Sequence, residues 1–231
     1  DCKRIHSFGA LSHFRRENAP EGSPERCIEG CPVGDTCPHN AMKIYYDDKR
    51  NHWVRGVAAS LPSGTETDCD VLKAMHTTEY GKCVYKCNNN VVDHQSVLVN
   101  FKSGATGTHN MVGGSSEPRR NIHIVGTKGE IFGNFEDSKY TVLKINPSPD
   151  AHNEECDVEV VDLKVSGDMV GAYGGHGGGD ERLSEDFVKF LRGEDPSLAC
   201  TSIFDSVAGH LSVYLADKSR EQGGELVHIE L

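Results

Sequence analysis

Alternation of apolar and polar residues dominates the middle of the chain. In 96–101 the side chains of Val97 and Val99 fall on one face of an extended backbone, a period of two that is typical of β-strands. Ser103-Gly104 predicts a turn from this strand into a hairpin partner. The predicted strands are 4–11, 96–101, 105–112, 121–125, 130–135, 140–146, 156–165 and a last edge strand at 225–231.

Apolar residues at helical spacing mark the C-terminal part. Segment 202–222 carries a stripe made by Ile203, Val207, Leu211, Tyr214 and Leu215, which predicts a helix with one buried face. The other predicted helices are 40–46, 67–76 and 183–192. Strands followed by helices predict an α+β fold, an open and mostly antiparallel sheet with helices packed on one face and the other face free for a partner. We expect one domain over residues 1–231.

Charge and cysteine content narrow the possible partners. The 231 residues carry a formal net charge of -11, which gives neither nucleic acid nor an anionic membrane an electrostatic reason to bind. The chain shows no apolar run of membrane-spanning length and no signal peptide. Its nine cysteines are odd in number, which favours reduced thiols in a cytoplasm over a secreted disulfide scaffold.

A turn-rich loop at 17–40 holds three closely spaced cysteines. Thiolates within one short loop can converge on Zn²⁺, which prefers four sulfur or nitrogen ligands. Cys87 and His39 are further candidates for the fourth position, although the fixed backbone of Pro38 restricts the geometry of His39. The alternative is a small loop core of free, buried thiols. The predicted zinc ligands are Cys27, Cys31, Cys37 and Cys83.

A second polar cluster, GKCVYKCNNNVVDHQ, occupies 81–95 just before an apolar strand. Its amides and carboxylate can pair with several hydroxyl groups at once, which suits a hydroxylated small molecule. Asp93 beside His94 is also a candidate acid–base pair. The alternative is a solvated loop whose asparagines form turns.

The third candidate is GGHGGGD at 174–180, directly before a predicted helix. Glycine allows the backbone to bend sharply or to approach a ligand closely, and a helix N-terminus offers free N–H donors. His176 and Asp180 are therefore candidates for the rim of a site. The alternative is a flexible connection between a sheet and a helix.

Five segments, in this order, resemble the C-terminal half of the Gfo/Idh/MocA oxidoreductases. They are HSFGALSHFRRENAPEG, RCIEGCPVGDTCPHNAMKIYY, GKCVYKCNNNVVDHQ, RRNIHIVGTKGEIFG and GGHGGGDERLSEDFVKFLRG. The resemblance implies an open antiparallel sheet that shapes a pocket for a sugar, cyclitol or related polyol. It also implies a homo-oligomer formed through the exposed sheet face, and a parent enzyme whose N-terminal Rossmann domain binds NAD or NADP.

The resemblance also assigns residues by position. It implies substrate contacts for Lys86, Asp93, His94, His176 and Asp180, and it adds weight to structural zinc at the cysteine loop. The family's glycine-rich nucleotide motif, its Glu-Lys-Pro motif with the catalytic lysine and its Asp-x3-His helix do not occur in this sequence. We therefore expect a substrate-binding and oligomerisation domain without its Rossmann domain, unable to bind nicotinamide and inactive alone. The alternative is a non-enzymatic, zinc-stabilised sheet module for protein assembly.

Overall fold

The computed structural model describes residues 1–148, 157–162, 179–197 and 199–229. The chain divides into two compact units. The first combines Asp1–Gly114 with His210–Leu231, and the second is Ser115–Gly209. The single-domain organisation expected from the sequence stays a prediction.

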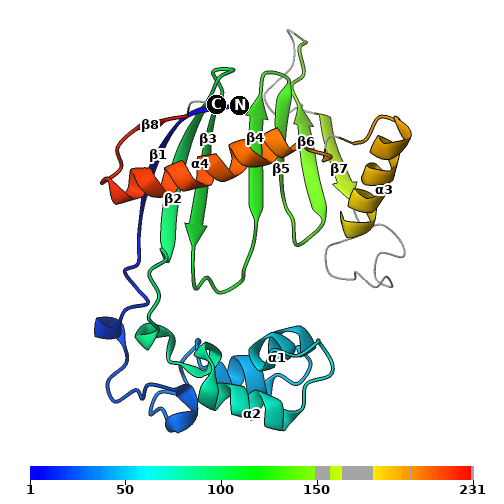
Figure 1. The fold of residues 1–231 in the computed structure, drawn as a ribbon. Coiled ribbons are helices and arrows are strands. Elements are labelled where there is room, and N and C mark those ends of the chain that lie inside the picture. The colour runs from blue at the N-terminus through cyan, green and yellow to red at the C-terminus, as the bar shows by residue number, and fades with distance from the viewer. Residues whose placement is uncertain (149–156, 163–178, 198, 230–231) are drawn as a thin grey trace. The chain divides into compact units, whose positions relative to one another are not determined.

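The first unit contains a four-stranded antiparallel sheet with the order β3-β2-β1-β8 (Figure 1). The strands are β1 (Cys2–Ala10), β2 (His94–Phe101), β3 (Thr106–Val112) and β8 (Val227–His228). The predicted hairpin of β2 and β3 is confirmed, and its turn uses Gly104 at a φ of 89°, where a side chain would be strained. Within 225–229, the described part of the predicted last strand, two residues pair with β1.

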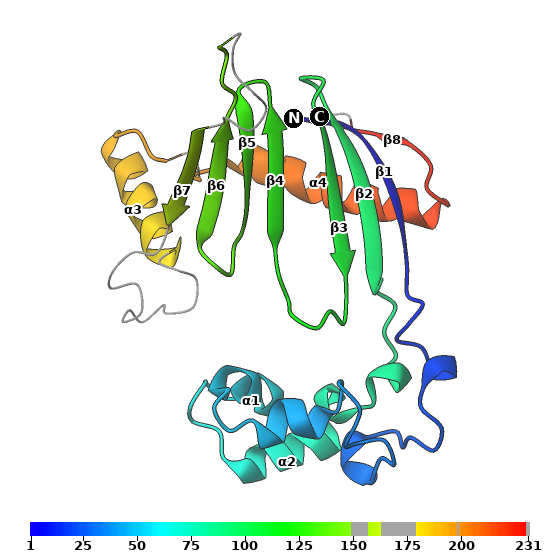
Figure 2. The same cartoon turned by 180° about the vertical axis from the view of Figure 1, so that it is seen from behind.

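Helix α4 (Ile203–Glu221) covers one face of this sheet with its C-terminal part. Ile5 of β1 is 1% exposed and packs with Ala216 of α4 and with Ile229. The backbone amide of Ser7 donates to the hydroxyl of Ser219 at 3.0 Å, so a polar contact accompanies the apolar one. Seen from behind, β1, β2 and β3 lie in front of the helix (Figure 2). The predicted helix on one face is therefore present here.

A small helical lobe lies between β1 and β2 in the chain. Its helices are α1 (His52–Ala59) and α2 (Asp68–Thr77), with short turns at η1 (Arg16–Asn18), η2 (Cys27–Glu29), η3 (Met42–Asp47), η4 (Glu79–Gly81) and η5 (Val84–Lys86). Thr67 and Asp70 cap the start of α2 reciprocally. The buried core is Ala41, Ala58, Ala74 and Met75. Helices η3 and α2 were predicted, whereas α1 was not, because it is short and carries Gly56 in its interior, where glycine lowers the helix propensity.

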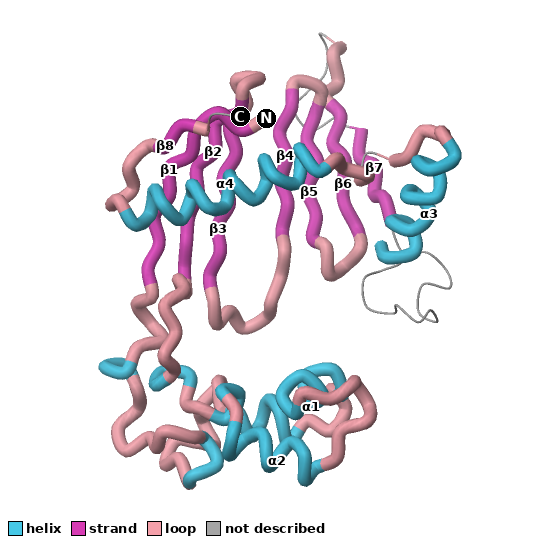
Figure 3. The backbone as a smooth tube through the Cα atoms, viewed as in Figure 1, coloured by secondary structure: helices cyan, strands magenta, loops and turns pink. Residues whose placement is uncertain are grey.

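The second unit contains an antiparallel meander with the order β4-β5-β6-β7 (Figure 3). Its elements are β4 (Asn121–Gly126), β5 (Gly129–Asn134), β6 (Lys139–Lys144), β7 (Asp157–Asp162) and α3 (Gly179–Arg192). The predicted α+β class with open antiparallel sheets is confirmed, with the strands distributed over two sheets where the sequence suggested one. None of the helices in the described part of the chain combines the length and apolar character that a membrane crossing requires.

Candidate functional site

The carboxylate of Asp93 fastens the chain after β1 to the beginning of β2. Asp93 is 7% exposed and directly precedes β2. Its Oδ2 accepts three backbone hydrogen bonds, from the amides of Ser12 at 3.0 Å, His13 at 2.6 Å and Phe14 at 3.1 Å. An ionised acceptor that meets several N–H donors forms strong hydrogen bonds. Asp93, which the sequence predicts as a substrate contact, therefore also stabilises the turn after β1.

The second oxygen of this carboxylate binds His94. Oδ1 of Asp93 lies 2.8 Å from Nδ1 of His94, and the side chain of His94 is 48% exposed. Burial alone would raise the pKa of Asp93, but the hydrogen bonds from His94 and from the three backbone amides hold that pKa well below its usual range. The pair thus joins a buried carboxylate to an imidazole that reaches solvent, an arrangement able to exchange hydrogen bonds with a hydroxyl group.

Four rings gather beside the same turn. They belong to His13, Phe14, His39 and Tyr85, with centroid separations from 4.8 Å for His13 and Phe14 to 6.4 Å for His13 and His39. The hydroxyl of Tyr85 lies 3.3 Å from Nε2 of His13. Burial, and secondarily the nearby His13, lower the pKa of His39, which favours its neutral form. Aromatic faces next to hydroxyl and imidazole groups suit a ligand with both polar and apolar surface.

Lys86 lies in the lobe, but its amine turns toward the turn-rich loop. The amine donates to the backbone carbonyl of Ser23 and lies 3.9 Å from Oε1 of Glu25. Its side chain is 15% exposed. The described contacts of Lys86 are therefore with the loop, and its role in substrate binding stays a prediction.

The glycine-rich candidate lies largely outside the described residues. His176 falls outside them altogether. Asp180 lies in the first turn of α3, and its side chain is outside the described part. Substrate contacts by these two residues stay predictions.

The four predicted zinc ligands line one small cavity. The cavity has a volume of about 10 Å³, room for about one water molecule. It is lined by the four cysteines Cys27, Cys31, Cys37 and Cys83, together with Ser23, His39 and Tyr85. All four are free thiols. Burial raises the pKa of Cys27, and the neighbouring thiols Cys83, Cys31 and Cys37 raise it further. Three cysteines of the loop and one from 81–95 therefore do come together.

Their arrangement nevertheless does not fit zinc. Among the residues that the structure describes, no group of three or more His, Cys, Asp or Glu side chains is placed to hold a metal ion. Zinc needs four ligand atoms at tetrahedral corners about 2.0 to 2.3 Å from the ion. The zinc prediction is therefore not supported, and the structure is consistent with the alternative of free thiols packed in a loop core.

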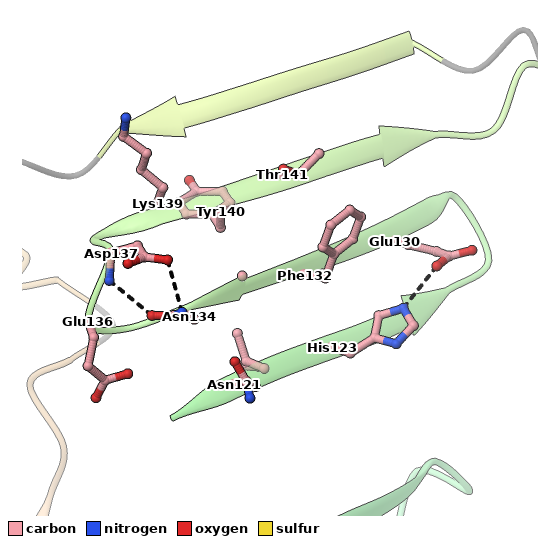
Figure 4. A pocket seen from close by; sticks show the side chains of 12 residues that line it. Asn121, His123, Glu130, Phe132, Asn134, Glu136, Asp137, Lys139, Tyr140 and Thr141 are labelled. Atoms are coloured by element: carbon pink, nitrogen blue, oxygen red, sulfur yellow. Dashed lines mark hydrogen bonds and ion pairs between the residues drawn. The ribbon is translucent and has the colours of Figure 1, made fainter. Parts of the chain in front are cut away.

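A broad hollow of about 840 Å³ lies on the sheet of the second unit. Figure 4 shows Phe132 within it, with the His123–Glu130 pair nearby and the Asn134–Asp137 pair at its edge. Nε2 of His123 is 2.9 Å from Oε2 of Glu130, and Nδ2 of Asn134 is 3.0 Å from Oδ2 of Asp137. Because these polar groups already pair with one another, the hollow is a weaker candidate than the Asp93 turn.

No known family model matches the chain, and no curated protein matches it in sequence. Solved structures similar to it include an oxidoreductase domain protein from Kribbella flavida, with 20% identity and a TM-score of 0.47 over 61% of this chain and 38% of that one. Levoglucosan dehydrogenase in complex with NADH and L-sorbose matches with 19% identity and a TM-score of 0.46, over 61% and 38% of the two chains. Its complex with NADH and levoglucosan matches with 19% identity and a TM-score of 0.46, over 61% and 39%. This chain spans less than two fifths of the length of these proteins.

Sequence reasoning found the Asp93–His94 pair but missed the rings beside it. His13 and Tyr85 are separated by 72 positions, and His39 was weighed only as a metal ligand. The available signal was the position of Ser12, His13 and Phe14 directly after a predicted strand, since residues that follow strands often line binding sites.

Proposed function

We propose that this chain is the substrate-binding and oligomerisation domain of an NAD(P)-dependent oxidoreductase that acts on a sugar, cyclitol or related polyol. The observation that carries the proposal is the half-exposed imidazole of His94 on the buried carboxylate of Asp93, beside the His13–Tyr85 pair. Ligands with several hydroxyl groups are recognised by such convergent donors and acceptors next to aromatic rings.

The five sequence segments that resemble the Gfo/Idh/MocA oxidoreductases support the same proposal. The nicotinamide cofactor, NAD or NADP, is inferred from that resemblance, and in this proposal it binds to a domain other than this chain. The chain alone then binds substrate and performs no hydride transfer. The eight described cysteines are free thiols, which supports a reducing, cytoplasmic location.

Exposed apolar side chains on the second sheet support oligomerisation. Phe132 of β5 is 40% exposed, and Val158 and Val160 of β7 are 61% and 64% exposed. The strand register places these three side chains on the same face of the sheet. Exposed apolar side chains on one sheet face favour association, and a homo-oligomer through the sheet face is the proposed state. Sedimentation of the purified chain tests it, because a monomer at micromolar concentration would contradict the proposal.

Activity of the complete reading frame tests the enzymatic part. The full-length protein is expected to reduce NAD⁺ or NADP⁺ with levoglucosan, D-glucose or myo-inositol, whereas the 231-residue chain alone gives no turnover. In the full-length protein, His94→Ala is expected to lower kcat/KM about tenfold or more, because the substrate loses one hydrogen bond. His109→Gln, an exposed histidine of β3, is the matched control.

Two outcomes would contradict this proposal. The first is turnover by the 231-residue chain without any other domain. The second is a complete reading frame without a nucleotide-binding strand–helix unit, which would favour the non-enzymatic assembly module instead.

A further inference from the structure

Asp93 is held by hydrogen bonds at its backbone amide, its backbone carbonyl and both carboxylate oxygens. Its backbone amide donates to the carbonyl of Ala10 at 2.9 Å, and its carbonyl accepts from the amide of Gly113 at 2.6 Å. Its Oδ2 already receives the three amides that follow β1. The carboxylate therefore cannot rotate without breaking several bonds, and the orientation of Oδ1 toward His94 is set by the fold.

The protonation of Asp93 decides which way its bond to His94 runs. Three N–H donors converge on Oδ2, an arrangement that favours the ionised carboxylate. An ionised carboxylate has only acceptors. The 2.8 Å contact between Oδ1 and Nδ1 must then be donated by the imidazole, so the proton of neutral His94 resides on Nδ1.

The other ring nitrogen is then left as an acceptor. In neutral imidazole one nitrogen donates and the other accepts, and the partner of the first fixes the role of the second. The side chain of His94 is 48% exposed. A ligand hydroxyl could donate to Nε2, whereas a ligand that offers only acceptors would find no donor there.

We propose that Asp93 is a positioning residue that holds His94 as the Nδ1–H tautomer, so that Nε2 of His94 accepts a hydrogen bond from a hydroxyl group of the substrate. This inference rests on the proposed function for its ligand, but the tautomer itself is a property of the chain alone. Asp93 then has two separable roles. It stabilises the turn after β1, and it determines that Nε2 of His94 is a hydrogen-bond acceptor.

The Asp93→Asn variant separates these two roles. The three backbone amides still require an oxygen at the Oδ2 position, so the amide oxygen of the asparagine takes that place and its NH₂ group faces Nδ1 of His94. Since an NH₂ group can only donate, Nδ1 becomes the acceptor and the proton moves to Nε2. The variant therefore keeps the turn but inverts the tautomer.

Long-range ¹H–¹⁵N NMR of the imidazole nitrogens measures the tautomer directly. At pH 8 the wild-type chain is expected to show His94 with its proton on Nδ1, and Asp93→Asn is expected to show it on Nε2. The spectrum of His109, on β3 of the same sheet, should not change. A purely structural role for Asp93 would leave the His94 tautomer the same in both proteins, and that result would overturn the inference.

Ligand titrations followed in the same spectra test the acceptor. D-glucose and myo-inositol are the probes, and 1,4-dioxane, which has no hydroxyl group, is the negative control. His94→Ala is expected to raise Kd about tenfold, which corresponds to one hydrogen bond of about 1.4 kcal/mol. His94→Gln keeps an acceptor oxygen and should recover part of the affinity, while His109→Gln should bind like the wild type.

The outcomes distinguish this inference from the proposed function. Polyol binding that persists unchanged in His94→Ala would overturn the inference and leave the proposed function standing. Failure of the wild-type chain to bind any polyol would count against both the proposed function and the ligand half of the inference. A circular dichroism spectrum of each variant confirms that the comparison concerns folded protein.

Discussion

Replacing Asp93 by alanine removes the acceptor that holds the turn after β1. The substitution leaves the amides of Ser12, His13 and Phe14 without Oδ2 and frees the His94 ring. Ser12 and His13 are exposed, whereas Phe14 is half-buried. Water can therefore replace part of what is lost, but not all of it.

The size of the effect follows from these bonds. Hydrogen bonds to a charged acceptor contribute about 1.5–3 kcal/mol when the site is dry, and about 1 kcal/mol when water competes. Three such bonds in this partly solvated turn give an expected loss of about 3 kcal/mol in the free energy of unfolding. With a urea slope of about 2 kcal/mol per M, the midpoint of unfolding should fall by about 1.5 M.

The same bonds predict how stability depends on pH. The pKa of Asp93 is lowered in the folded chain, so its contribution is fully present above the unfolded value of about 3.9 and is lost as the pH falls toward the folded pKa. The difference in stability between wild type and Asp93→Ala should therefore be largest at pH 6 and should shrink below about pH 4.

Urea unfolding of wild type and Asp93→Ala at pH 6 and at pH 3.5, followed by circular dichroism, checks both expectations. Glu21→Ala, at an exposed carboxylate of the same unit, controls for the loss of one negative charge. A midpoint shift no larger than that of the control, or a difference that grows as the pH falls, would refute the role given to Asp93.

Four further predictions concern the core, the cofactor and the thiols. Gly81→Ala should cost about 3 kcal/mol in the free energy of unfolding, because a Cβ there would lie 1.9 Å from the carbonyl oxygen of Met75; an unchanged Tm would contradict this. Ile5→Ala should cost about 3 kcal/mol and Ile5→Val about 1 kcal/mol, since Ile5 is 1% exposed beneath α4; equal urea midpoints for the two variants would be incompatible with close packing. Neither NADH nor NADPH should change its fluorescence on addition of the chain, and saturable binding would show a nicotinamide site that we do not expect. Elemental analysis of the purified chain should find no stoichiometric zinc, and one zinc per chain would reinstate the predicted cysteine site.

Several features followed from the sequence because their causes are local. The alternation of Val97 and Val99 determined β2, and the turn at Gly104 determined its pairing with β3. Helix α4 was predictable from its apolar stripe, and Ser202 and Asp205 cap its start reciprocally. Asp93 and His94 were recognisable as an acid–base pair because they are adjacent in the chain. Periodicity, turn chemistry and capping all act over a few residues, which is why a single sequence displays them.

The rest depended on contacts between distant segments. The amides of 12–14 meet a carboxylate about eighty positions away, and this convergence gives Asp93 a structural role that the sequence did not predict, while its ligand contact stays a prediction. Tyr85 reaches His13 only because η5 folds back beside that turn. The four cysteines do meet, yet spacing could not predict whether their sulfurs would adopt metal-binding geometry, since side-chain directions are set by packing. Sequence periodicity determined the elements of this protein, whereas the direction of each functional side chain was decided by the tertiary structure.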